Sequence, residues 1–214
     1  MFTEKFDSYV CEGDKIKCEI DGFAATATVY YDDDNSPPWE RDEGHGPVSD
    51  WTSRDILLGE RILSADRYSH RYYDFAEAVK IAKRDGWDTK PYGTGTKDEQ
   101  AVRAAERDFE VLKAWCDDQW HYVGVAVTVS RKGVTLTHKW NHALWGIEGN
   151  YPDSNNEYLT EVANELLDDA LDDARKTMAK LIADYYTAPD DVALSAKDAA
   201  AIQEDRMVDD RAGQ

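Results

Sequence analysis

The segment KIKCEIDGFAATATVYY, residues 15–31, decides the fold class. Its first six residues alternate between polar and apolar side chains, and residues 23–31 are rich in β-branched and aromatic types. The Asp21-Gly22 dipeptide between them favours a tight hairpin turn. The sequence therefore predicts an antiparallel β-hairpin over residues 15–31.

Further strands are expected between residues 119 and 148. Residues 119–130 (QWHYVGVAVTVS) alternate strongly, with four valines on one face and Tyr122, Gly124, Ala126 and Thr128 on the other. Arg131-Lys132-Gly133 turns the chain into residues 134–138, and residues 143–148 (ALWGIE) have the pattern of a short strand. These strands are expected to belong to the same antiparallel sheet as the hairpin.

Helical periodicity is found in three segments, residues 74–85, 97–116 and 156–186. The first two begin with the side chains of a capping box, Asp74 with Glu77 and Thr96 with Glu99. We therefore expect an α+β fold in which the antiparallel sheet packs on three main helices.

The length of 214 residues suits a single domain, which we place at residues 1–190. Residues 32–50 contain two adjacent prolines and two glycines, so they are expected to form a long loop inside this domain. Residues 191–214 are expected to form an acidic C-terminal tail that is partly helical or frayed.

The net charge of −19 lies in the two terminal segments of the chain. Residues 1–50 carry 13 acidic and 4 basic side chains, residues 151–214 carry 16 and 6, and the residues between them are neutral. This charge argues against a non-specific nucleic-acid binder and against a protein drawn to anionic lipid, because both need cationic surfaces. We therefore expect neither direct nucleic-acid binding nor membrane binding.

The cellular compartment is indicated by what the sequence lacks. It has no apolar run of 18 residues and no basic-plus-apolar leader, so neither a membrane span nor a secretory signal is expected. The three cysteines, Cys11, Cys18 and Cys116, are an odd number without metal-ligand spacing, which fits a reducing cytoplasm.

The helix expected at residues 156–186 has one strongly acidic face, opposite its apolar stripe. The carboxylates of this face are candidate partner-binding residues: Glu157, Glu161, Glu165, Asp168, Asp169, Asp172 and Asp173. Acids early and bases late in a helix also suit the helix macrodipole, and surface acids keep a protein soluble. A role in solubility alone therefore remains an alternative explanation of the acidic face. The apolar stripe on the other side of the helix could pack in a homodimer interface as easily as in the core.

The loop at residues 32–50 and the tryptophan after it supply a second set of candidates. Two tryptophans stand among charges, glycines and prolines, a composition typical of binding loops, although both rings could simply cover an open end of the sheet. An EF-hand is excluded because Pro37 stands where that loop needs glycine, while a looser divalent-metal site that includes His45 remains an alternative. The partner-binding candidates here are Asp32, Asp33, Asp34, Trp39, Glu40, Glu43, His45 and Trp51.

No motif singles out a catalytic set. His138 and His142 have the spacing of a zinc pair on a helix, but they stand in a strand pattern. Residues 92–96 (YGTGT) precede a helix but lack the spacing and lysine of a phosphate-binding loop. We therefore assign no catalytic residue, no metal and no cofactor.

Four Trp-rich or aromatic stretches resemble a family of small acidic proteins encoded by tailed bacteriophages and related mobile elements. They are PPWERDEGHGPVSDWTSRD (37–55), RYYDFAEAVKIAKRDGWD (71–88), DDQWHYVGVAVTVS (117–130) and LWGIEGNYPDSNNEYLTEVANEL (144–166). The similarity covers roughly residues 20–185. It implies an accessory phage protein that acts in the host bacterial cytoplasm, and it implies no activity or catalytic residue.

In that context the leading hypothesis is an anti-defence inhibitor of the anti-CRISPR or anti-restriction type. A site built from lysine and arginine to neutralise phosphates also attracts fixed carboxylates, so the acidic helix face and the acids of residues 32–43 would mimic DNA towards a host defence nuclease or CRISPR effector. One alternative is a metal-dependent hydrolase or nucleotide-processing enzyme that uses residues 32–45. Another is a structural or regulatory interaction module of the phage.

Overall fold

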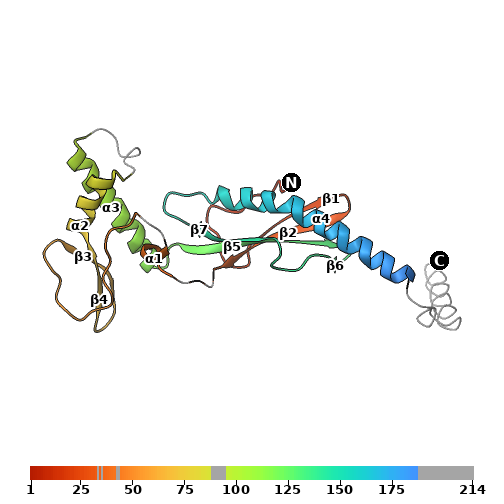
Figure 1. Ribbon diagram of the computed structural model, residues 1–214, viewed down its shortest axis with the longest axis horizontal. Coiled ribbons are helices and arrows are strands. Elements are labelled where there is room, and N and C mark those ends of the chain that lie inside the picture. The colour runs from red at the N-terminus through yellow and green to blue at the C-terminus, as the bar shows by residue number, and fades with distance from the viewer. Residues whose placement is uncertain (33, 35, 42–43, 88–94, 188–214) are drawn as a thin grey trace, which may run out of the picture.

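The computed structural model describes residues 1–187 apart from residues 33, 35, 42–43 and 88–94, so the tail expected at 191–214 lies outside the described residues. Its elements form two lobes that follow one another along the long axis of the molecule (Figure 1). In chain order they are β1 (Lys15–Ile20), β2 (Phe23–Tyr31), α1 (Pro38–Arg41), β3 (Glu60–Ala65), β4 (His70–Asp74), α2 (Phe75–Asp85), α3 (Lys97–Cys116), β5 (His121–Arg131), β6 (Val134–Thr135), β7 (Ala143–Gly149) and α4 (Glu157–Thr187).

The first lobe, here called the sheet lobe, is built on an antiparallel sheet. Its strand order is β1-β2-β5-β6, and β7 also pairs with β5. Asp21 and Gly22 both have positive φ, 52° and 75°, which is the geometry of the mirror-image turn that joins tightly paired strands. The predicted hairpin at residues 15–31 is therefore confirmed, and the strands expected at 119–148 do belong to the same sheet.

Helix α4 covers one face of this sheet and forms the main core with it (Figure 1). The valines of β5 meet the apolar stripe of α4, in which Leu159, Val162 and Leu167 are buried. The N-terminal segment closes the core with three further buried residues, Phe2, Phe6 and Val10. The four valines predicted to share one face of residues 119–130 therefore do so, because alternate residues of a strand point to opposite faces of a sheet.

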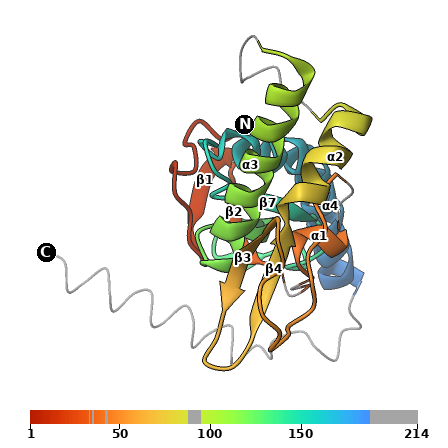
Figure 2. The same ribbon diagram turned by 90° about the vertical axis from the view of Figure 1, so that its left-hand side faces the viewer.

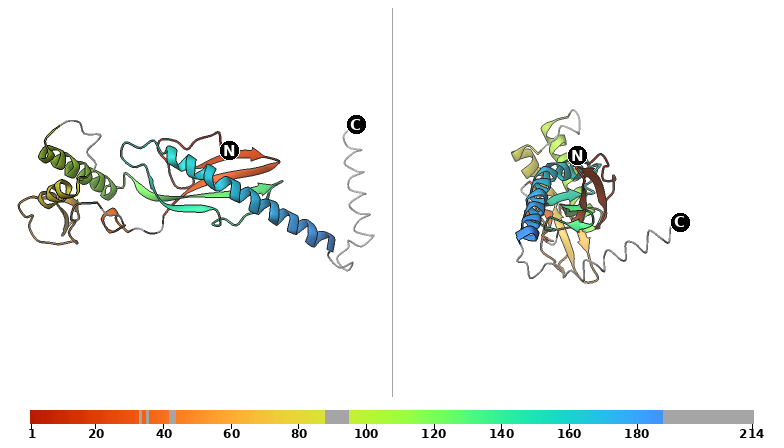
Figure 3. Two further views of the ribbon diagram at one scale, coloured as in Figure 1. Left: turned by 45° about the horizontal axis from the view of Figure 1, so that its top comes forward. Right: turned by 90° about the vertical axis from the view of Figure 1, so that its right-hand side faces the viewer.

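The last turns of α4 extend past the sheet (Figure 3). Leu181 and Ile182 are about half exposed, and Tyr185 and Tyr186 are more than three-quarters exposed. Within the described residues, no helix combines the length and the apolar character that a membrane span requires.

The second lobe, here called the hairpin lobe, contains β3, β4, α2 and α3 (Figure 2). The β3–β4 hairpin was not predicted, because residues 60–74 lack a sustained alternation of polar and apolar residues. Both helices start where expected: Asp74 caps α2 through the backbone N–H of Glu77, and Thr96 and Glu99 form a capping box on α3.

The α+β class is confirmed, but only α4 of the three main helices packs on the large sheet. Helices α2 and α3 pack on each other and on β3, around a separate core that includes Leu63, Tyr73 and Leu112. The two cores meet where the end of α3 contacts the start of β5. There the indole N–H of Trp120 donates to the Val111 carbonyl at 2.9 Å.

Candidate interaction surface

The predicted acidic face of α4 lies on the outer surface of the sheet lobe. Because the apolar stripe of α4 faces the sheet, the opposite side of the helix points to solvent. Six of its carboxylate residues are exposed and Asp173 is half-buried at one edge. We call this set the acidic ridge: Glu157, Glu161, Glu165, Asp168, Asp169, Asp172 and Asp173.

Three residues of the acidic ridge have basic neighbours. Glu157 lies 3.3 Å from the Lys5 ammonium, and hydrogen bonding from Asn155, together with Lys5, lowers the pKa of its carboxyl. Asp172 pairs with Arg175 at 2.8 Å within α4. The carboxylate of Asp173 lies 3.2 Å from Nε2 of His142, a residue of the loop between β6 and β7.

The middle of the acidic ridge is uncompensated. Among the described residues, Glu161, Glu165, Asp168 and Asp169 take part in no ion pair and no side-chain hydrogen bond. A groove of about 520 Å³ lies at the C-terminal end of this stretch and is lined by Asn141, His142, Asp169, Asp172, Asp173 and Lys176. The ridge therefore presents four free carboxylates together with a flanking groove.

Two acids of the loop at residues 32–50, Asp32 and Asp34, stabilise the loop through contacts with other loop residues. Asp32 pairs with the guanidinium of Arg41 at 3.4 Å, and Arg41 also donates to the Asp34 carbonyl at 3.0 Å. The hydroxyl and backbone N–H of Ser36 donate to Asp34 and lower the pKa of its carboxyl. Glu40 is exposed, whereas Asp33 and Glu43 lie outside the described residues.

The two tryptophans predicted to bind a partner both lie close to one arginine. The Arg71 guanidinium carbon is 4.9 Å from the centre of the Trp39 ring and 5.3 Å from that of Trp51. Trp39 is half-buried and packs edge-on against Trp115, while Trp51 is 45% exposed. Trp39 is thus a packing residue of the junction between the lobes, and Trp51 is the surface member of the pair.

His45 belongs to a buried hydrogen-bond cluster that sequence reasoning missed. Its Nδ1 lies 2.6 Å from Asp108 of α3, and Asp108 also accepts hydrogen bonds from the Tyr73 hydroxyl at 2.6 Å and the Gly46 N–H at 2.8 Å. Asp108 is 8% exposed, and burial together with this carboxylate raises the pKa of Tyr73 far above its usual range. In the sequence, Asp108 is one charge on a charged helix, and nothing there shows that it is buried.

The described part of the chain assembles no metal centre, and one of its partly buried thiols is unreactive. It holds no group of three or more His, Cys, Asp or Glu side chains that could bind a metal ion. All three cysteines are free, and burial raises the pKa of Cys116 to about 11. At neutral pH this thiol is therefore protonated, which makes it a poor nucleophile.

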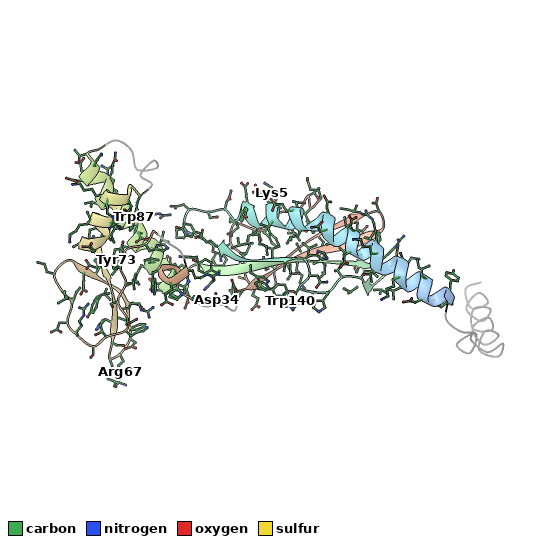
Figure 4. All side chains as sticks on the ribbon, viewed as in Figure 1. Lys5, Asp34, Arg67, Tyr73, Trp87 and Trp140 are labelled. Atoms are coloured by element: carbon green, nitrogen blue, oxygen red, sulfur yellow. The ribbon has the colours of Figure 1, made fainter. Side chains whose placement is uncertain are left out.

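The structure separates the two sets of sequence candidates. The acidic ridge follows α4 along the sheet lobe, whereas α1 and the His45 cluster belong to the junction and the hairpin lobe (Figure 4, where Asp34 and Tyr73 are labelled). In the described residues Asp32 and Asp34 are engaged within the loop, whereas Glu40 and Trp51 are exposed. The acidic ridge is therefore the larger exposed set of candidates. The chain matches no family model, no curated protein and no solved structure.

Proposed function

We propose that this protein is a non-enzymatic inhibitor that binds a host nucleic-acid-handling protein through the acidic ridge. The supporting observation is the spacing of the charges. Glu157 and Asp173 are 16 residues apart, which corresponds to about 24 Å along a helix that rises 1.5 Å per residue. Seven carboxylates over that length give one per about 4 Å, close to the ~3.4 Å per phosphate along one strand of B-DNA.

Such a row of fixed charges suits a partner with a basic nucleic-acid cleft. A cleft that neutralises phosphates gains similar attraction from carboxylates at similar spacing, and the association is fast and sensitive to salt. The four uncompensated acids of the ridge are already free of basic partners within the described residues, so no internal ion pair has to break. The resemblance to bacteriophage accessory proteins adds the context of host defence, with a CRISPR effector or restriction nuclease as partner.

The alternative of a metal-dependent enzyme receives no support from the described part of the loop. Asp32, Asp34 and His45 each have a partner inside the fold, which leaves them poorly placed to gather around an ion. The alternative of a structural or regulatory interaction module uses the same ridge and differs only in the partner.

The proposal is tested by affinity purification from nuclease-treated host lysate, with washes at low and then high salt. We expect a nuclease or CRISPR effector that elutes with salt and whose activity the purified protein inhibits. The ridge variant Glu161→Lys, Glu165→Lys, Asp168→Lys and Asp172→Lys should lose both capture and inhibition while keeping its circular dichroism spectrum.

A matched control variant reverses four acids of the hairpin lobe: Glu77→Lys, Asp85→Lys, Asp98→Lys and Glu110→Lys. It changes the net charge by the same amount but leaves the acidic ridge intact. If the ridge is the binding surface, this control should still capture the host partner. Equal loss in both variants would show that net charge alone matters. Unchanged inhibition by the folded ridge variant would overturn the proposal, and capture of phage particle proteins alone would favour the structural module.

A further inference from the structure

The face of the sheet opposite α4 carries no helix in the described part of the chain (Figure 1). In Figure 4, Trp140 lies on this side, whereas Lys5 lies on the side of α4. The strand register places side chains in rows across the face: Lys15 lies beside Thr28, and Lys17 lies beside Thr26, which in turn lies beside Thr128. We call this surface the open face. Its residues are independent of the acidic ridge, so it can be tested separately.

The open face is locally basic in a strongly acidic protein. A groove of about 470 Å³ on it is lined by Lys15, Lys17, Lys139, Tyr30 and five hydroxyl side chains: Thr26, Thr28, Thr128, Ser130 and Thr135. None of these lining residues is acidic. The neighbouring acids are Glu19, which follows Lys17 on the same face of β1, and Glu4, which accepts the backbone N–H of Lys17 at 3.1 Å. Three ammonium groups with hydroxyl donors suit a ligand that carries several negative charges.

A row of aromatic rings borders this groove. The Tyr30 and Trp140 rings lie 4.9 Å apart, and Trp140 lies 5.5 Å from Trp145. The Lys139 ammonium is held over both Tyr30 and Trp140, at 4.3 and 4.0 Å from their ring centres. Trp140 and Trp145 remain 43% and 41% exposed, so part of each indole can contact a ligand.

Trp145 lies against the sheet at a point where β5 has no side chain, because the residue there is Gly124. A Cβ atom on Gly124 would lie 2.3 Å from the indole and within 2.7 Å of two more of its atoms. Only glycine at this position lets the ring approach the strand so closely. The resulting platform joins exposed aromatic rings directly to the basic groove.

We propose that the open face binds single-stranded nucleic acid, with bases stacked on Trp140 and Trp145 and phosphates held by Lys15, Lys17 and Lys139. Aromatic platforms combined with a basic track are the usual means of holding unpaired strands, because every base offers a flat face. In a duplex the bases are stacked on one another, so their faces are not available to such a platform.

The net charge of −19 does not oppose this local site at physiological ionic strength. The carboxylates of the acidic ridge stand on the outer side of α4, and a helix with side chains is already about 10–12 Å across. The Debye length at 0.15 M salt is about 8 Å, so the ridge is largely screened from the open face. The net charge therefore opposes non-specific duplex binding, which needs an extended cationic surface, and is compatible with a small segregated site.

The test is fluorescence anisotropy of a labelled 12-nucleotide oligo(dT) titrated with the full chain at several salt concentrations. We expect saturable binding, quenching of tryptophan emission, and a salt slope that falls by about 0.7 for each lysine replaced. Trp140→Ala and Trp145→Phe should each weaken binding, Trp140→Ala by at least about five-fold. Lys15→Gln, Lys17→Gln and Lys139→Gln together should abolish it at 0.15 M salt.

Three lysines of the hairpin lobe give the matched control, Lys80→Gln, Lys83→Gln and Lys97→Gln, which should leave binding unchanged. The ridge variant should keep the part of oligonucleotide binding that Trp140→Ala weakens, which separates this proposal from the proposed function, because the ridge variant loses capture of the protein partner. Absence of oligo(dT) binding would overturn the inference. So would equal binding of inorganic polyphosphate that is insensitive to Trp140→Ala, because the face would then be only a site for anions.

Discussion

Tyr73 on β4 donates a 2.6 Å hydrogen bond to Asp108 on α3, and this buried contact joins the two halves of the hairpin lobe. The same carboxylate accepts the Gly46 N–H, so it also fixes the loop that leads into β3. A Cβ atom on Gly46 would lie 2.5 Å from the Tyr73 hydroxyl and 2.6 Å from the Ala78 side chain. The loop therefore packs against this pair with no room for a larger residue.

Replacing Asp108 by alanine should destabilise the hairpin lobe by about 2–4 kcal/mol, because the Tyr73 hydroxyl, the Gly46 N–H and His45 all lose their acceptor in a buried site. Urea denaturation followed by circular dichroism measures the change. Glu110→Ala removes an exposed acid from the same helix and should cost less than about 0.5 kcal/mol. Equal stability of the two variants would mean that the buried cluster does not stabilise the lobe.

Gly124→Ala should displace the Trp145 indole from the sheet at a cost of about 1 kcal/mol, since a partly exposed ring can move outward to relieve the overlap. Because the displaced indole is more exposed to water, we expect tryptophan emission to shift to longer wavelength. In a Trp145→Ala background the same glycine substitution should cost nearly nothing, because the overlapping ring is absent. A cost that is the same in both backgrounds would contradict the close approach of these two residues.

Arg41→Ala should loosen the junction of the lobes. Its guanidinium lies 4.0 Å from the centre of the Tyr122 ring and pairs with Asp32, so the substitution removes a stacking contact and an ion pair together. We expect a loss of about 1–2 kcal/mol in urea denaturation, only partly restored by Arg41→Lys, because an ammonium group cannot stack and pair at once. Arg67→Ala, at an exposed arginine of the β3–β4 turn, is the control and should have little effect.

Cys116 should react with iodoacetamide at pH 8 about a hundred-fold more slowly than an ordinary thiol, because its pKa of about 11 leaves little thiolate. Cys11 is exposed and should be labelled first, as peptide mass spectrometry can show. Labelling of Cys116 should rise as the pH approaches 11. Rapid labelling of Cys116 at pH 8 in the folded protein would contradict its burial.

The same raised pKa predicts the direction of a stability change. The neutral thiol is favoured in the folded state, so its contribution is complete below the ordinary thiol pKa of about 8.5 and is lost as the pH rises towards 11. Thermal unfolding of the native chain between pH 8 and pH 11 should therefore decline more steeply than that of Cys116→Ala. Parallel declines would show that other groups account for the whole change.

Local patterns in the sequence were sufficient for the elements with strong periodicity or clear turn chemistry. The Asp21-Gly22 turn, the alternation of residues 119–130, the capping box at Thr96 and the apolar stripe of α4 each depend on neighbours a few residues away. The acidic face of α4 could be listed residue by residue for the same reason, since helix geometry alone places those side chains together. The short strands β3 and β4 have no comparable local signal, and they were missed.

What the sequence determined by itself was therefore the α+β class, most of its elements and the one-sided charge of α4, because these follow from the periods of helix and strand. Only the tertiary structure decided that α2 and α3 build a separate lobe and that Asp108 is buried beneath Tyr73 and His45. It likewise decided that two lysines of β1 and Lys139 of the loop after β6 line one groove, and that Trp145 lies over Gly124. Those relationships join residues tens to more than a hundred positions apart, and the packing of whole elements, not local propensity, brings them together.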